Sequence, residues 1–162
     1  MSKTTKLMLV LGGAFLACAS GVIASRVARA TPPVGVTNTL LAGPIVFDEI
    51  DAVAHTGNYK TRLKTWGLSD GYVRHLTIAP GGGTGWHSHP GIVFVLITAG
   101  TATFYDECDD FTPQVYPAGT GFVEDAGCVH LLANEGNADV ELIAFFLVPK
   151  GAPPRIDEPA PQ

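Results

Sequence analysis

The sequence predicts an all-β domain, either a sandwich or a small barrel, that follows an N-terminal signal segment. Three observations support this prediction. The 162 residues include 19 Gly and 12 Pro, which interrupt regular structure too often for a helical bundle. After position 31, no run of ten or more residues shows an apolar period of 3.6 residues. Short apolar runs instead alternate with Gly, Pro and Asp clusters, at the spacing of strands and turns.

Composition and charge exclude several classes of protein. Hydrophobic residues make up 46% of the chain and charged residues 15%, which excludes disorder throughout. The net charge is −5 and no basic patch occurs, so we expect no nucleic-acid partner. The three Cys lack CxxC spacing, which excludes a structural zinc ribbon. The length suits one domain.

The first element in chain order is a targeting segment. Lys3 and Lys6 form a basic start, and residues 7–25 then carry no charge. Ala28-Arg29-Ala30 has the small-x-small pattern of a signal-peptidase site before Thr31. We therefore expect residues 1–30 to be a cleaved signal peptide and the mature protein to be secreted or periplasmic.

Two alternatives remain open for this segment, and only these would bring the protein to a membrane. The uncharged run is just long enough to span a bilayer, so it would serve as an anchor if it were not cleaved. Residues 15–18 weakly resemble a lipobox, which would make Cys18 a lipidation site. Ser20, Gly21 and the two Pro at 32–33 favour cleavage.

The rest of the chain divides into a linker at 31–38, a β domain at 39–150 and a Pro-rich tail at 151–162. The least clear stretch, 50–64, holds either a short helix or an extra strand. Strands are expected at Thr39–Phe47, Gly71–Ala79, Ile92–Ala99, Thr101–Tyr105, Gln114–Tyr116, Gly121–Glu124, Cys128–Asn134 and Val140–Val148.

Three histidines are the candidate metal ligands. His87 and His89 are separated by one residue, so an extended chain projects both imidazoles to the same side. His130 opens a later apolar segment. Three converging neutral imidazoles would bind a divalent transition metal. Taken alone, a His-x-His pair is more often a solvated loop feature.

The spacing around these histidines resembles two motifs of the cupin superfamily. Gly81-x5-His87-x-His89-x3-Val93-x6-Gly100 is similar to the first motif, and Gly119-x5-Asp125-x-Gly127-x2-His130-x3-Asn134 is similar to the second. Four of five positions match in each, in the right order, and the similarity spans Gly71 to Pro149. The resemblance implies a double-stranded β-helix, the jelly-roll barrel of cupins, with a metal held at its centre by the three histidines.

Val93 departs from the family pattern, which has a Glu ligand at this position. A neutral three-His set remains, and it accepts Fe, Zn, Mn, Ni or Cu. Two functions follow. The favoured one is an exported barrel that binds one divalent transition metal and a small-molecule ligand, without an assigned catalytic residue. The alternative is a metal-dependent enzyme that resembles non-haem iron dioxygenases and acts on a small organic substrate.

Other polar residues near the motifs are assigned structural roles. Glu124 and Asp125 have opposite parity, so only one of them can face the barrel interior, and we expect both to be solvated at the surface. His55 and His75 lack partner spacing and are not ligands. Trp86 either walls the pocket mouth or packs in the ordinary way.

The remaining expectations concern the pocket wall, the thiols and the assembly. Asn134 either lines the cavity or closes a turn. Cys108 and Cys128 are expected to form a disulfide after export, and the alternative is a free Cys128 thiolate at the metal. A homodimer paired through sheet edges is left open. Apolar candidates for the pocket lining are Phe94, Leu96, Phe122, Leu132 and Phe145.

Overall fold

The computed structural model describes residues 30–161 and confirms the all-β class. The expected signal peptide therefore lies outside the described residues, except for Ala30. Within the described range, no helix is long and apolar enough to cross a membrane. The only helical element there is a single 3-10 turn, η1 (Glu107–Asp109). The strands are β1 (Val34–Phe47), β2 (Asp51–Thr56), β3 (Tyr59–Lys64), β4 (Ser69–Gly83), β5 (His87–Ser88), β6 (Ile92–Ala99), β7 (Thr101–Asp106), β8 (Gln114–Pro117), β9 (Gly121–Glu124), β10 (His130–Ala133), β11 (Val140–Pro149) and β12 (Ile156–Asp157).

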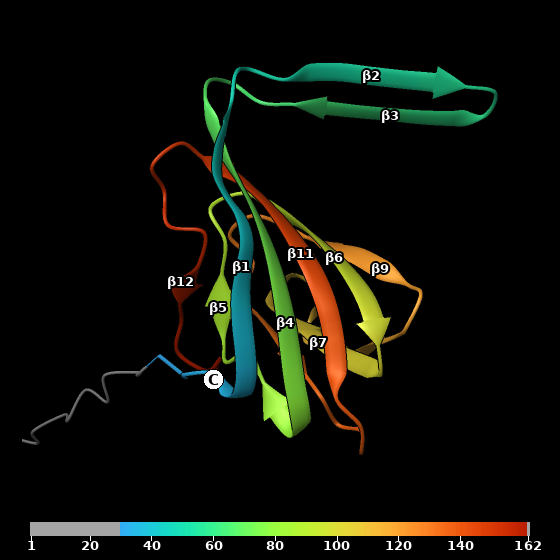
Figure 1. The fold of residues 1–162 in the computed structure, drawn as a ribbon, viewed down its shortest axis with the longest axis vertical. Coiled ribbons are helices and arrows are strands. Elements are labelled where there is room, and N and C mark those ends of the chain that lie inside the picture. The colour runs from blue at the N-terminus through green and yellow to red at the C-terminus, as the bar shows by residue number, and fades with distance from the viewer. Residues whose placement is uncertain (1–29, 162) are drawn as a thin grey trace, which may run out of the picture.

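The strands form a double-stranded β-helix of two antiparallel layers. One layer has the order β1-β4-β11-β6-β9, and these strands lie side by side in Figure 1. The other layer pairs β12 with β5, β5 with β10, β10 with β7 and β7 with β8. The layers join where β10 meets β4, at the pair Ala133 and Gly83. The sheet therefore folds back on itself around one interior.

The core of the barrel follows from strand alternation. In β6, Val93, Val95 and Ile97 are buried, and the residues between them are exposed. Each buried Val, Ile or Leu side chain stabilises the fold by about 1.5–3 kcal/mol. The core cluster comprises Leu76, Ile78, Val93, Val95, Ile97, Ala102, Phe104, Leu132, Val140, Leu142, Ala144, Phe146 and Val148.

Three sequence predictions of pocket-lining residues are wrong. Phe94, Leu96 and Phe145 point away from the interior: Leu96 is 51% exposed, and the ring of Phe94 stacks on that of Phe145 with their centroids 6.3 Å apart. Both faces of this layer carry apolar side chains, so hydrophobicity alone did not separate inside from outside. Phe122 and Leu132 do pack against the core.

The structure also corrects several boundaries. Residues 34–38, expected in the linker, belong to β1, which pairs with β4 as an edge strand. Residues 50–64 contain no helix; β2 and β3 form a hairpin that projects from the barrel (Figure 1). The strand expected from Cys128 begins at His130. β5 was not among the expected strands, and the tail contains β12, which pairs with β5.

Candidate metal centre

The three histidines predicted from spacing converge in the barrel. His87 and His130 are direct cross-strand partners between β5 and β10, and His89 follows two residues after His87. The ring centroids lie 4.4 Å (His87 to His130), 4.8 Å (His87 to His89) and 4.9 Å (His89 to His130) apart. All three residues are buried, and one nitrogen of each lies within 4.8 Å of the other two. This is a compact three-nitrogen donor set.

Backbone carbonyls orient each imidazole through its Nδ1. Nδ1 of His87 lies 2.8 Å from the Gly85 carbonyl oxygen, and Nδ1 of His130 lies 2.9 Å from that of Cys128. Nδ1 of His89 lies 2.6 Å from the Pro154 carbonyl oxygen. A carbonyl only accepts, so each Nδ1 carries the proton, and in the neutral ring Nε2 presents a lone pair.

The Nε2 atom of His130 is fully buried and has no hydrogen-bond partner among the described residues. Such an orphaned acceptor is costly unless something binds it. Metal-ligating histidines in proteins usually donate the other ring nitrogen to a carbonyl or carboxylate, as here. The donor set therefore fits a divalent transition metal.

Burial also favours the neutral form of His87 and His130. Burial is the largest cause and, together with electrostatic repulsion from His130, Arg155 and His89, it lowers the pKa of His87 to about 2. Burial likewise lowers the pKa of His130. Only the neutral imidazole binds a metal, so this environment favours the ligating form at ordinary pH.

Local structure fixes the strand that carries His130. Gly127 adopts a positive φ of 80° in the turn after β9, and its N–H donates to the His89 carbonyl at 2.9 Å. Cys128 forms a disulfide with Cys108, with their Cα atoms 5.7 Å apart. The predicted bridge is therefore present. Because the Cys128 sulfur is bonded to Cys108, it is not a free thiolate that could bind a metal.

Glu124 is the site residue that sequence reasoning placed wrongly. It was expected at the surface, yet it is only 6% exposed and its Oε2 lies 3.2 Å from His89 Nε2 and 3.7 Å from His130 Nε2. Asp125 is exposed, as expected from opposite parity. The sequence did hold a signal for an inward Glu124. Phe122, a predicted lining residue, lies two positions before it on β9, so both side chains point to the same face.

A cavity surrounds these groups. An inner part of about 30 Å³ is bounded by His87, His89 and Glu124 and otherwise mostly by apolar side chains, such as Leu142 and Phe146. A second part of about 140 Å³ shares both histidines and extends to Arg74 and Arg155. The site thus combines a buried donor set with a small space that a ligand can enter.

The C-terminal tail supplies part of this site, which the sequence did not indicate. β12 pairs with β5, so that Asp157 lies opposite His87. Pro154 provides the carbonyl for His89, and the Arg155 guanidinium donates to the Thr84 carbonyl oxygen at 2.9 Å. The tail therefore holds the segment His87–His89 in place through these contacts.

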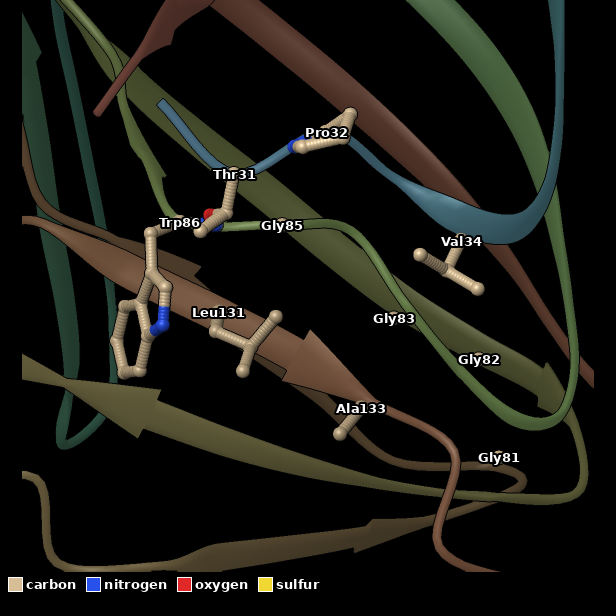
Figure 2. Close-up of a pocket in the computed structure, with 10 residues that line it drawn as sticks. All are labelled: Thr31, Pro32, Val34, Gly81, Gly82, Gly83, Gly85, Trp86, Leu131 and Ala133. Carbon is tan, nitrogen blue, oxygen red and sulfur yellow. The ribbon is translucent and has the colours of Figure 1, made fainter. Parts of the chain in front are cut away.

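Trp86 does not wall this cavity. Its ring packs edge-on against Phe111, with centroids 5.6 Å apart. It lines a separate pocket of about 310 Å³, which Figure 2 shows beside Leu131 and the glycines at 81–83 and 85. No side chain that titrates near neutral pH lines that pocket, so it offers no comparable chemistry.

The other predicted residues have structural positions. Asn134 closes a turn: its amide donates to the carbonyls of Ile78 at 2.7 Å and Ala138 at 2.8 Å. His75 faces outward beside Glu141, with 3.6 Å between Nε2 and Oε2. His55 lies on the projecting hairpin. Neither histidine belongs to the cluster of His87, His89 and His130.

Comparisons with known proteins find one family model and several solved structures that are similar to this chain. Residues 74–146 match the family model of the cupin domain. A cupin-like protein from Thermotoga maritima is 19% identical, over 56% of this chain and 65% of that chain, with a TM-score of 0.50. A cupin superfamily protein from Desulfitobacterium hafniense is 14% identical, over 70% of this chain and 77% of that chain, with a TM-score of 0.49. A predicted oxalate decarboxylase from Thermotoga maritima is 23% identical, over 51% of this chain and 81% of that chain, with a TM-score of 0.42. No curated protein matches the sequence.

Proposed function

Because residues 74–146 form a cupin-type domain, we propose that this protein is an exported metal-binding cupin that holds one divalent transition metal through His87, His89 and His130 and binds a small molecule beside it. One observation carries the proposal: the Nε2 atom of His130 is fully buried and has no hydrogen-bond partner among the described residues, inside a cluster whose three Nδ1 atoms all face carbonyl oxygens. Fe, Zn, Mn, Ni and Cu are all compatible with imidazole ligands.

The cavity suggests the chemical character of the small molecule. Its outer part, about 140 Å³, has the volume of roughly five water molecules at ~30 Å³ each. Arg74 lines this space, and its only side-chain hydrogen bond among the described residues goes to Asn38, at 3.1 Å. Arg155 lines it too and is paired with Asp157. Two guanidinium groups beside a metal favour a small anion such as a carboxylate.

An enzyme similar to non-haem iron dioxygenases is the second candidate. Two observations favour it: a three-His set leaves coordination positions open, and Leu76 and Phe146 make the cavity wall beside His87 and His89 apolar. Bound iron would supply the activation of oxygen, and the apolar wall would exclude water. Glu124 adds an acid-base group that sequence reasoning did not expect in the cavity.

Export is part of the proposal. The Cys108–Cys128 disulfide suits an oxidising compartment, and disulfides are rare in the cytosol. The basic start and the uncharged run of residues 7–25 are consistent with a signal peptide.

The proposal is tested with the double variant His87→Ala/His130→Ala and the matched control His55→Ala/His75→Ala, whose histidines lie outside the cavity. Each purified protein is loaded with Zn²⁺ or Fe²⁺, desalted and analysed for metal. We expect one equivalent in the wild type and the control and none in the site variant, with the circular dichroism of a β-rich domain retained. Metal retained by the site variant would overturn the assignment.

A second measurement separates the two candidate functions. Oxygen consumption by the iron-loaded protein with a small diketone, thiol or phenol supports the enzyme. A protein that holds stoichiometric zinc and is inert across that panel supports the binding module. For the ligand, isothermal titration with acetate and oxalate is compared between the wild type and Arg74→Gln, with Arg62→Gln on the exposed hairpin as the control. Weaker binding is expected only in Arg74→Gln.

A further inference from the structure

Val93 stands where the family pattern has a Glu, and its cross-strand partner is itself a Glu, Glu124. Val93 is fully buried on β6, and its direct partner across the antiparallel ladder to β9 is Glu124. Residues directly opposite in such a ladder project to the same face, with Cβ atoms about 4.5–5.5 Å apart. The Glu124 side chain therefore starts one strand away from Val93 and points into the same interior.

Glu124 reaches the metal-facing atoms of two histidines. Its Oε2 lies 3.2 Å from Nε2 of His89 and 3.7 Å from Nε2 of His130. These are the atoms left free once each Nδ1 donates to a carbonyl. The contacts therefore involve the ligating face of the cluster.

The charge of Glu124 has no other compensation among the described residues. The only basic side chains in contact with its carboxylate there are the two histidines, and no Lys or Arg is among them. The side chain is 7% exposed and bounds the 30 Å³ inner cavity with His87 and His89. A buried carboxylate that faces imidazole lone pairs is unfavourable, and a cation between them removes the conflict.

We infer that Glu124 is a fourth protein ligand of the metal and that β9 supplies the carboxylate that Val93 on β6 lacks. This inference rests on the proposed function. The donor set is then three neutral nitrogens and one anionic oxygen, which neutralises one charge of a divalent ion. An oxygen donor also suits Mn²⁺ better than a set of nitrogens alone does.

The test compares Mn²⁺ affinity in the wild type, Glu124→Gln and Asp125→Asn, measured from the free Mn²⁺ signal in electron paramagnetic resonance. Glu124→Gln keeps the volume and removes the charge, and Asp125→Asn does the same to the exposed neighbour. We expect Glu124→Gln to weaken binding by on the order of 10–100-fold or more, since changing a supporting group alone costs that much. Asp125→Asn should match the wild type.

A rescue variant separates ligation from a structural role. Val93→Glu/Glu124→Val returns the carboxylate to β6 and should bind Mn²⁺ more tightly than Glu124→Gln. The absorption spectrum of Co²⁺-loaded protein should differ between the wild type and Glu124→Gln, because a ligand is lost. Thermal unfolding of the metal-free proteins serves as the fold control, and there Glu124→Gln should be no less stable than the wild type.

The outcomes distinguish this inference from the proposed function. Equal Mn²⁺ affinity and equal Co²⁺ spectra in the wild type and Glu124→Gln overturn the role of Glu124, while the three-His site stands. A metal-free Glu124→Gln that melts lower, with unchanged affinity, means that Glu124 only forms an ion pair with protonated histidine. A wild type that binds neither Mn²⁺ nor Co²⁺ overturns both.

Discussion

His87 and His130 face each other as direct cross-strand partners between β5 and β10, and their ring centroids lie 4.4 Å apart. The 42 residues between them in the chain include two whole strands of each layer. The barrel closure therefore creates the site, and features that hold β5 or β10 in place should control metal affinity.

The C-terminal tail should be required for tight metal binding. Removing residues 153–162 deletes β12 and the Pro154 carbonyl that orients His89. We expect metal affinity to fall by on the order of 10–100-fold, as with other groups that support metal ligands. Equilibrium titration with Mn²⁺ measures this, with circular dichroism as the check on the barrel. A chain lacking only residues 160–162 is the control, and equal affinity in both truncated chains would refute the role of the tail.

The disulfide should stabilise the fold and the position of His130. Cys128 provides the carbonyl for His130 Nδ1, and the bridge to Cys108 closes a separation of 20 residues. Replacing both cysteines with Ser should lower the free energy of unfolding by about 3 kcal/mol, as measured in urea. Thiol counting on the denatured, non-reduced mature protein should find none. Two titratable thiols would show that the bridge does not form.

The metal-free protein should lose stability in mild acid through His87. Its folded pKa of about 2 lies below the ordinary value of 6.5, so protonation favours the unfolded chain. The contribution of neutral His87 to the free energy of unfolding is complete above pH 6.5. It is lost as the pH falls below 6.5 toward 2, by up to about 1.4 kcal/mol per pH unit. Urea unfolding between pH 4 and 7 should show a steeper decline in the wild type than in His87→Gln. Parallel declines would contradict the prediction.

The mature protein should begin at Thr31, outside the cytoplasm. The prediction rests on the Ala28-Arg29-Ala30 pattern after the uncharged run. N-terminal sequencing of exported protein decides it. A chain that begins at Met1 and partitions into membranes means an anchor, and an acylated Cys18 at the start means a lipoprotein.

The parts of the fold that could be predicted from sequence are those with a local signal. Ile92–Ala99 and Gly121–Glu124 were predicted with the observed bounds, because Gly and Asp clusters delimit them. The histidine trio was predicted because alternation places His87 and His89 on one side and motif spacing added His130. β5 and β12 are only two residues long and depend on pairing with distant segments, so they are too short to show a strand-like alternation in the sequence.

Glu124 shows why the site was only partly predictable. Its parity with Phe122 pointed inward, but the general rule that carboxylates are exposed outweighed that signal. The pairing with Val93 depends on the register between β6 and β9, because Val93 and Glu124 lie 31 positions apart in the chain. Register was not readable from the chain, whereas the structure gives it directly.

The most direct test of the central claim is the metal content of protein purified from its native compartment, determined by elemental analysis alongside the His87→Ala/His130→Ala variant prepared in the same way. The three-His site predicts one transition metal per wild-type chain and none in the variant. A wild type that carries no metal, both as purified and after incubation with Fe²⁺, Mn²⁺, Ni²⁺, Cu²⁺ or Zn²⁺, would contradict the claim.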